Sequence, residues 1–202
     1  MTALVATNNL HKKRELEDLF PSWTLLLPGD VGRPGWDHEE TADTFLGNAL
    51  GKAQSLWTAV DGRYPVLADD SGICVDVLGG APGVYSARYG QDEAGRPLSD
   101  YEKNLLLLRN MESRTDRRAR FVCALAWIVA PHRVFTVEEA WEGEVALSVE
   151  GSHGFGYDPL FLLPSLGLTS GQIPPDEKNR LSHRYRACRR LAALAADLEN
   201  FA

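Results

Sequence analysis

The sequence predicts an α/β fold. Short apolar runs typical of buried strands alternate with segments in which apolar residues recur every three or four positions, as on one face of a helix. Of the 202 residues, 44% are hydrophobic and 24% are charged, values typical of a globular protein with a sizeable core. Neither repeats nor a break in composition divides the chain. We therefore expect a single domain over residues 1–202.

The predicted strands are short apolar runs bounded by polar or turn-forming residues. They cover residues 3–6, 24–27, 66–70 and 120–130, with a strand pair over 134–147 and a short strand after the Gly-rich turn that starts at Gly151. We expect the third strand to end at its two acids, because Ser71 and Gly72 follow at once. Residues 79–90 and 165–180 are rich in Gly, Pro or polar side chains, so we expect loops there.

Four helices are predicted from apolar residues at helical spacing. One lies within residues 12–20, one within 100–111, and one runs from about His183 to the C-terminus. The remaining helix has Thr44 as its predicted N-cap and extends to about Val60. Asn48 and Lys52 are four residues apart in it, so one helical face presents both side chains.

Charge and cysteine usage exclude several classes of protein. The formal net charge of −7 argues against a general nucleic-acid or membrane-surface binder, and the basic run 114–120 fits a solvated loop before a strand. No apolar run approaches the ~20 residues needed to cross a membrane, and the N-terminus lacks a signal-peptide pattern, so we expect a cytoplasmic protein. The widely spaced Cys74, Cys123 and Cys188 fit reduced thiols better than disulfides or a zinc site.

The adjacent acids Asp69 and Asp70 need an explanation, because neighbouring carboxylates repel and are costly to bury. A metal ion or cationic side chains would offset this cost. One of these acids, together with Glu39 or Glu40, would suit a divalent cation bound to a triphosphate, although exposed glutamates are more often simply solvated. If the strand extends through the pair, only one Asp faces the ligand and the other holds the loop or a supporting partner.

Two further segments could bind an anionic, flat ligand. The turn Thr7–Lys12 follows a strand and opens a helix, which suits phosphate, although a simply capped helix start explains it as well. In the "GFGYDP" segment, Phe155 and Tyr157 flank a glycine, an arrangement for stacking on a base or for packing in the core. Near the C-terminal helix lies a cationic group of three residues, which would also suit a solvated helix start: Lys178, His183 and Arg184.

These motifs together resemble one family. "ATNNLHK", "EETADTF", "LADDSG", "LGGAPGVYSARY", "GFGYDP" and "LSHR" occur in this order, and the chain is similar from residue 3 to about 190 to the inosine/xanthosine triphosphate pyrophosphatases, or Ham1-like enzymes. The resemblance implies a long mixed β-sheet flanked by helices, two lobes with a central active-site cleft, and a homodimer. It also implies Mg²⁺-dependent hydrolysis of ITP, dITP and XTP to the nucleoside monophosphate and pyrophosphate.

The matching motifs carry the family's site residues onto this chain. The implied triphosphate-binding residues are Thr7, Asn8, Asn9, Leu10, His11, Lys12 and Lys52. The implied magnesium ligands are Glu40 and Asp70, with Asp70 also the base for the attacking water and Asp69 the second choice. Ser71 would touch the substrate, and the implied base-binding residues are Phe155, Gly156, Tyr157 and Asp158. The residues implied to read the 6-oxo group of the base or nearby phosphates are Lys178, His183 and Arg184.

Two departures from the family pattern stand out. Asn8 replaces a common glycine in the first turn, where Asn can also adopt positive φ, and Gly47 replaces a common acid. The rival interpretations are a Maf-type pyrophosphatase acting on other nucleotides, a nucleotide sensor without turnover, and a purely structural α/β domain. "GGAPGVYSARY" and "SHR" argue against the Maf type, the paired acids argue against a sensor, and a structural domain leaves the motifs unexplained.

Overall fold

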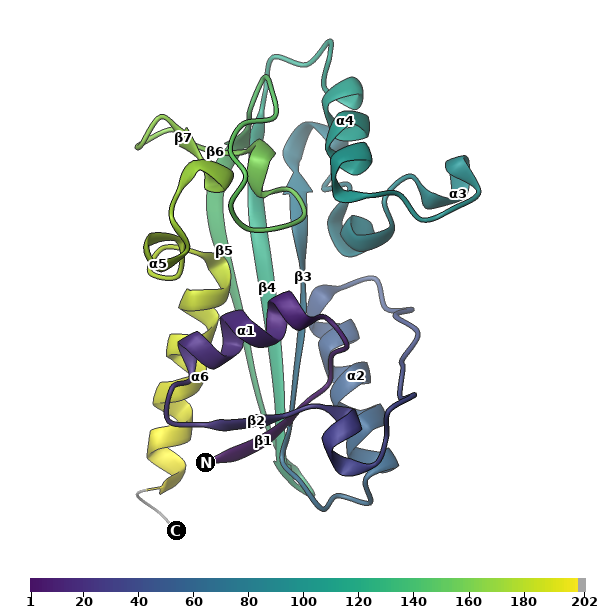
Figure 1. Cartoon of the computed structure of the whole chain (residues 1–202), viewed down its shortest axis with the longest axis vertical. Helices are drawn as coiled ribbons and strands as arrows, with labels where there is room; N and C mark the ends of the chain where they lie inside the picture. Colours follow the sequence, from purple (N-terminus) through teal and green to yellow (C-terminus); the bar gives the residue numbers. More distant parts are fainter. Residues whose placement is uncertain (200–202) are drawn as a thin grey trace. The chain divides into compact units, whose positions relative to one another are not determined.

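The computed structural model describes residues 1–199 and confirms the α/β fold (Figure 1). Seven strands form one sheet in the order β2-β1-β3-β4-β5-β6-β7. β1 is parallel to β2 and β3, whereas β6 is antiparallel to β5 and β7, so the sheet is mixed as expected. The strands are β1 (Thr2–Val5), β2 (Thr24–Leu26), β3 (Val66–Val75), β4 (Arg118–Ala130), β5 (Arg133–Val145), β6 (Phe161–Leu163) and β7 (Leu168–Thr169).

Helices of very different lengths accompany the sheet. They are α1 (Leu10–Leu19), α2 (Phe45–Ala59), α3 (Gln91–Ala94), α4 (Asp100–Asn110), α5 (Pro175–Lys178) and α6 (His183–Glu199). Short 3-10 helices are η1 (Pro28–Val31), η2 (Asp76–Leu78), η3 (Gly83–Arg88), η4 (Asp158–Leu160) and η5 (Ser170–Gln172). The four predicted helices correspond to α1, α2, α4 and α6. Thr44 is the N-cap of α2, as predicted, because its hydroxyl accepts a hydrogen bond from the Gly47 N–H.

The chain divides into two compact units. Within the described chain, the first comprises residues 1–70, 123–139 and 183–199, and the second comprises 71–122 and 140–182. Strands β3, β4 and β5 contribute residues to both units. The single domain and the cleft between lobes stay predictions.

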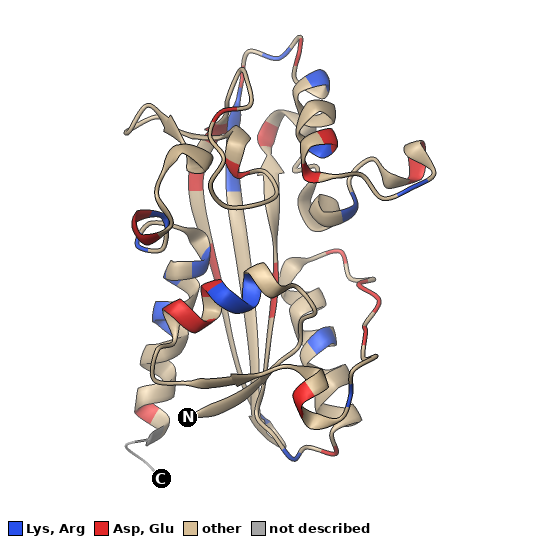
Figure 2. Cartoon of the chain, in the orientation of Figure 1, with Lys and Arg blue, Asp and Glu red and all other residues tan. Residues whose placement is uncertain are grey.

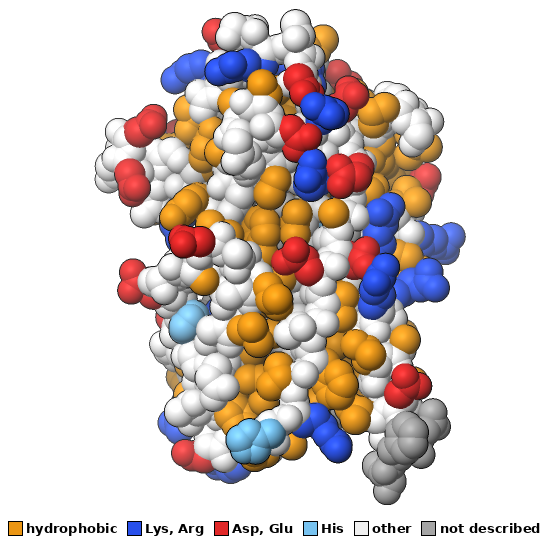
Figure 3. Space-filling view, turned by 180° about the vertical axis from the view of Figure 1, so that it is seen from behind, with side chains coloured by type: hydrophobic (Ala, Val, Ile, Leu, Met, Phe, Trp, Pro, Cys, Tyr) orange, Lys and Arg blue, Asp and Glu red, His pale blue; other side chains and the backbone are white. Residues whose placement is uncertain are grey.

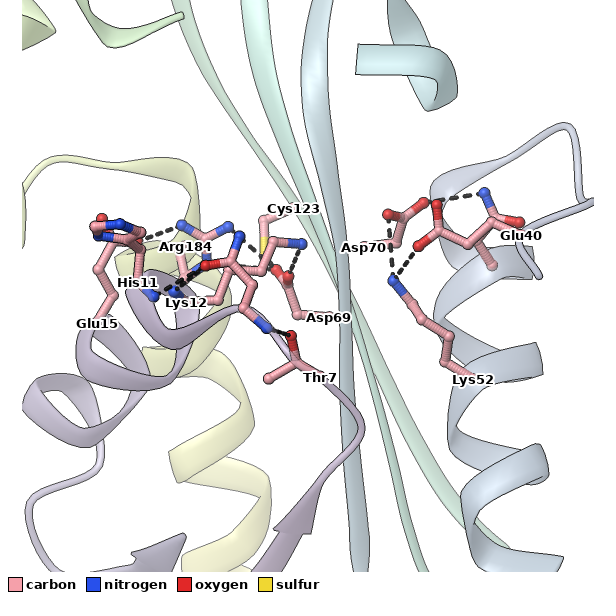
Figure 4. Close-up of polar contacts among 12 residues, drawn as sticks. Thr7, His11, Lys12, Glu15, Glu40, Lys52, Asp69, Asp70, Cys123 and Arg184 are labelled. Atoms are coloured by element: carbon pink, nitrogen blue, oxygen red, sulfur yellow. Dashed lines mark hydrogen bonds and ion pairs between the residues drawn. The ribbon is translucent and has the colours of Figure 1, made fainter. Parts of the chain in front are cut away.

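The first unit is built around a core of strand and helix residues. Buried side chains of β1, β3 and β4 pack with those of α1 and α6, among them Val5, Leu67, Trp127 and Leu191. In Figures 1 and 4, α1 and α6 lie on one side of the unit's strands and α2 lies on the other. Because both faces are covered, the first residues of β3 form a continuous buried apolar run, and its two acids are exceptions to that pattern.

The second unit has its own core, formed by β-strand residues with α4 and the "GFGYDP" segment. Its buried members include Ile73, Leu107, Phe121, Tyr157 and Phe161. The Phe121 and Phe161 ring centroids lie 4.5 Å apart. Tyr157 is thus anchored in a core, while Phe155 beside it is only partly buried.

The expected end of β3 at the acids is wrong, since the strand continues to Val75. Gly72 forms no turn. An added Cβ there would lie 2.4 Å from the Ser86 Oγ and 2.6 Å from the Gly83 carbonyl oxygen, so the glycine admits a closely packed η3. The Ser86 Oγ also accepts a hydrogen bond from the Ile73 N–H at 3.0 Å. A glycine that suggested a turn therefore serves a close approach instead.

Two other segment predictions are corrected. Residues 134–147 contain one strand, β5, and not a strand pair. The expected loop 165–180 contains β7, η5 and α5. Local hydrogen bonds explain this order, because Gln172 Oε1 accepts from the Thr169 N–H at 2.8 Å and the Thr169 hydroxyl donates to the Glu150 carbonyl at 2.7 Å.

Charges of both signs are interspersed along the chain. Figure 2 shows Lys and Arg followed by Asp and Glu along α1, and Figure 3 shows acidic and basic side chains on the same face of the molecule.

None of the helices within residues 1–199 combines the length and hydropathy that a membrane crossing requires.

Two leucines on α4 test the core of the second unit. Leu107 is fully buried and Leu105 is 41% exposed. Leu107→Ala should lower the free energy of unfolding by about 2–5 kcal/mol, because it leaves a cavity, whereas Leu105→Ala should cost less than about 1 kcal/mol. Urea unfolding of both variants measures the difference. Equal losses would contradict the assignment of Leu107 to the core.

Candidate active site

The two acids of β3 point to opposite faces of the strand (Figure 4). Asp69 faces α1 and α6, and Asp70 faces α2. Both are buried, at 3% and 5% exposure. Since successive side chains of a strand alternate, the continuation of β3 through the pair separates two carboxylates that would otherwise repel each other at one site.

Asp69 is held by two cations and a thiol. It forms an ion pair with Lys12 of α1, and its Oδ2 accepts from the Arg184 Nε and Nη2, each at 3.3 Å. The Cys123 thiol donates to the same oxygen at 3.2 Å. Arg184 also pairs with Glu15 of α1. Asp69 and Glu15 thus hold Arg184 between β3 and α1 within the first unit (Figure 4).

These cations decide the protonation state of Asp69. Burial alone would raise the pKa of its carboxyl, but Lys12, Arg184 and Lys52 outweigh this effect and hold the pKa well below its usual range. A carboxylate that binds protons so weakly and is enclosed by its partners is a poor proton acceptor. Asp69 therefore serves as the buried counter-charge of Lys12 and Arg184, which disfavours it as the catalytic base.

Asp70 has a different environment on the α2 side. Its Oδ2 accepts from the Asn48 amide at 3.1 Å, and its Oδ1 lies 3.4 Å from the Lys52 Nζ. Lys52 also donates to Glu40 Oε1 at 2.6 Å, so one ammonium group brings the two carboxylates together. The predicted shared face of Asn48 and Lys52 is confirmed, because both side chains reach Asp70.

The electrostatics of Asp70 suit proton transfer. Burial raises the pKa of its carboxyl, Lys52 counters this, and Glu40 adds to the rise. For Lys52, burial would lower the pKa, but Asp70 and Glu40 raise it, so the ammonium form is retained. Asp70 thus binds protons more readily than an ordinary Asp, which is the direction a general base requires.

Glu40 and Asp70 also fit the donor set of a hard divalent cation. Mg²⁺ prefers oxygen ligands and commonly takes one or two protein carboxylates, with substrate phosphates and water completing the octahedron. Within residues 1–199 no group of three or more His, Cys, Asp or Glu side chains could hold a metal ion. A Mg²⁺ ion here would therefore depend on substrate oxygens as well as on the protein.

The first turn is a capped helix start. The Asn9 side chain accepts from the His11 and Lys12 N–H groups at 2.9 and 3.2 Å, and the Asn9 N–H donates to the Thr7 hydroxyl at 3.0 Å. The Asn8 amide donates to the Trp36 carbonyl at 3.0 Å. Among described residues other than glycine, positive φ occurs only at Asp61 and His132. Asn8 thus replaces the common glycine without the left-handed conformation that we considered.

The "GFGYDP" segment is organised around Asp158 in the second unit. This buried carboxylate accepts from the Phe155 N–H at 2.8 Å, the Ser170 hydroxyl at 2.7 Å and the Lys178 Nζ at 2.6 Å. The Lys178 Nζ also lies 5.3 Å from the Phe155 ring centroid. Phe155, Asp158 and Lys178 therefore lie together: the partly buried Phe155 ring is beside the Lys178 cation, and Asp158 accepts hydrogen bonds from both residues.

The predicted cationic group is divided between different partners. Lys178 belongs to the second unit and pairs with Asp158, whereas Arg184 belongs to the first unit and pairs with Asp69 and Glu15. His183 is buried at the start of α6. Ser71, the first residue of the second unit, is partly buried in β3 next to Asp70. The roles of these residues and of Gly156 in substrate binding stay predictions.

Sequence reasoning missed Glu15 as part of this arrangement. Glu15 follows Lys12 by three positions, so one face of α1 presents both, and this spacing was a usable signal. Its partner Arg184 is 169 positions away, and no local pattern indicates that contact. Cys123 was predicted only to be a reduced thiol, yet it donates a hydrogen bond to Asp69.

Comparisons with known proteins identify the family of the chain. The model of the Ham1 family matches residues 3–194. A dITP/XTP pyrophosphatase of Treponema denticola is 43% identical over 187 residues, covering 93% of this chain and 94% of that protein.

Solved structures extend the similarity to the fold. A HAM1 protein from Coxiella burnetii has a TM-score of 0.87 at 33% identity, covering 98% of this chain and 99% of that one. The Staphylococcus aureus Ham1 protein has a TM-score of 0.83 at 34% identity, with 100% of both chains covered. The fold, the ordered motifs and these matches lead to one conclusion: the chain belongs to the Ham1 family.

Proposed function

We propose that this protein hydrolyses non-canonical purine nucleoside triphosphates such as ITP, dITP and XTP to the nucleoside monophosphate and pyrophosphate. The observation that carries the proposal is the Asp70–Glu40–Lys52 arrangement in a chain of the Ham1 family, whose relatives include named dITP/XTP pyrophosphatases. The reaction removes deaminated purines from the nucleotide pool.

In this proposal, the first unit handles the triphosphate. Lys12 is partly buried and retains 15% exposure of its side chain while paired with Asp69, so a phosphate oxygen can reach its ammonium group. Lys52 offers a second cation, and the α1 N-terminus offers the positive end of a helix dipole. Thr7, Asn8 and Asn9 shape that turn.

Asp70 accepts the proton of the water that attacks the α-phosphorus. Lys52 favours the ionised form of the Asp70 carboxyl, and the Asn48 amide fixes the orientation of that group. Glu40 and Asp70 would hold Mg²⁺, which would supply charge neutralisation for the triphosphate and polarise the reacting phosphoryl group. We propose that Ser71, the next residue of β3, also contacts the substrate.

The second unit contributes to recognition of the base. Phe155 and the backbone of Gly156 offer a flat surface, and Lys178 beside them provides a hydrogen-bond donor that suits a 6-oxo purine. The 6-amino group of adenine would meet this donor unfavourably, so ATP should be rejected. We propose that His183 and Arg184, which belong to the first unit, read the 6-oxo group or nearby phosphates. We also propose that the enzyme acts as a cytoplasmic homodimer.

A substrate panel tests the function. Pyrophosphate release should be strong with ITP and XTP, weak with GTP, ATP and dTTP, and lost when EDTA removes the metal, because the Glu40 and Asp70 carboxylates would then repel the phosphate oxygens. Coupled detection of pyrophosphate gives each rate.

Either of two results would overturn this proposal. Preference for dTTP would favour a Maf-type enzyme, and binding of ITP without pyrophosphate release would favour a sensor. Turnover that persists in EDTA would remove the metal from the mechanism.

Substitution of the two acids should separate their roles. Asp70→Asn should lower turnover at least about 100-fold because the base is lost, with little loss of stability, because the amide avoids burial of a charge. Asp69→Asn should reduce the free energy of unfolding by about 3–5 kcal/mol, because Lys12 and Arg184 lose their buried counter-charge. Pyrophosphate release and urea unfolding measure the two effects. Near-normal turnover of Asp70→Asn would remove Asp70 as base, and full stability of Asp69→Asn would contradict the counter-charge role.

Neighbouring lysines on α1 test phosphate binding. Lys12→Ala should raise the KM for ITP by about 10- to 100-fold, with a smaller effect on kcat, because a charge-assisted hydrogen bond to phosphate is lost. Lys13→Ala is the matched control, since Lys13 pairs with Glu17 on the helix surface. Initial rates should be measured at a temperature where both variants are folded. An unchanged KM and rate in Lys12→Ala would argue against this contact.

A further inference from the structure

Helix α4 holds the backbone of Gly156 at both of its polar groups. The Gly156 N–H donates to Asp100 Oδ2 at 2.7 Å, and the Gly156 carbonyl accepts from the Asn104 amide at 2.9 Å. Asp100 and Asn104 are four residues apart, so they lie on one face of α4. Two neighbouring side chains thus form hydrogen bonds to the backbone of one residue, which is 52 positions away from Asn104 in the sequence.

Further contacts fix Asp100 and the segment that contains Gly156. The Lys103 Nζ lies 2.8 Å from Asp100 Oδ1 and donates to the Ala87 carbonyl at 3.2 Å, which fixes the carboxylate. The next residue of the segment is fixed as well, because the Tyr157 hydroxyl donates to the Ser86 carbonyl at 2.9 Å. All of these residues belong to the second unit.

Asn104 is a costly choice for core packing alone. The residue is 2% exposed, and its amide oxygen is buried without a hydrogen-bond partner in the described part of the chain. An apolar side chain would avoid that unpaired oxygen, so the useful part of Asn104 is the nitrogen that binds Gly156. This makes the contact with Gly156 the physical reason for a polar residue at this position.

Gly156 has open space beside it. Its φ is +62°, which favours glycine, and an added Cβ would meet no heavy atom within 4 Å. The protein therefore does not crowd this backbone, and a flat ligand can approach it next to Phe155. The position of the backbone is set by α4 and not by packing around the glycine itself.

We propose that Asp100 and Asn104 are positioning residues that fix the Gly156 backbone for recognition of the purine base. This inference rests on the proposed function, and it extends the base-recognition machinery to a helix that contributes no motif residue. A segment held in one conformation presents its ring and donors at a defined distance, so a base with the wrong edge cannot be accommodated by a small backbone shift.

The test uses the full-length protein and four variants. Asn104→Ala and Asp100→Ala each remove one of the two side-chain hydrogen bonds to the Gly156 backbone. Asp100→Asn is the conservative variant, because its amide oxygen can still accept from the Gly156 N–H. Tyr101→Ala is the matched control, since Tyr101 is on the same helix and 61% exposed. Asp100 is half exposed, so its truncation remains informative if Asn104→Ala fails to fold.

Hydrogen–deuterium exchange without nucleotide provides the first measurement. Amides of residues 155–158 should exchange at least about fivefold faster in Asn104→Ala and Asp100→Ala, because the segment opens more often. Exchange in Asp100→Asn should stay close to the unmodified protein, and Tyr101→Ala should show no change. Unchanged exchange in both alanine variants would overturn the claim that Asp100 and Asn104 fix the Gly156 backbone, whatever the activity of the protein.

Kinetics then test the role in specificity. The ratio of kcat/KM for ITP to that for ATP should fall about tenfold in the two alanine variants and recover in Asp100→Asn. Inhibition by inorganic pyrophosphate, which lacks a base, should stay within about twofold. Equal losses for ITP, ATP and pyrophosphate would overturn the specificity role and indicate general destabilisation. No turnover of ITP by the unmodified protein would instead overturn the proposed function, and with it the specificity role. The exchange experiment would still test whether Asp100 and Asn104 fix the Gly156 backbone.

Discussion

The alternation of side chains along β3 is the constraint on which the site depends. Asp69 and Asp70 are adjacent in sequence, yet one strand places them on opposite faces and gives each a separate set of partners. A turn at this point would have left both charges together in solvent or facing the same partner. The continuation of the strand lets one acid organise buried cations while the other keeps a raised pKa beside α2.

Ion pairs with carboxylates hold the Lys and Arg side chains that the sequence analysis assigned to the site. Lys12, Lys52, Lys178 and Arg184 each contact a carboxylate, and Lys178 does so within the second unit. Burial lowers the pKa of Lys52 and of Arg184, but their carboxylate partners raise it, so both side chains keep their charge. In the proposed function, a triphosphate would compete with existing partners and would not have to organise the cations itself. This preorganisation would then serve both fold stability and the proposed phosphate binding in the first unit.

The sequence predicted the features that local patterns determine. Thr44 as a cap, the shared face of Asn48 and Lys52, and the helices α4 and α6 all follow from spacing within a few residues. The end of β3 was predicted wrongly because Gly72 serves close packing against Ser86, which a local pattern cannot distinguish from a turn. The contacts of Arg184 with Glu15 and of Asn104 with Gly156 depend on long-range folding, so no spacing rule could find them.

The central claim is that the two acids differ in protonation because they face different partners. Carboxyl chemical shifts of ¹³C-labelled protein, followed during a pH titration, measure this directly for each residue. Asp70 should titrate above the ordinary Asp value of about 3.9, and Asp69 should stay ionised throughout the range in which the protein is folded. Two similar titrations near the ordinary value, or protonation of Asp69 before Asp70, would contradict the division of roles.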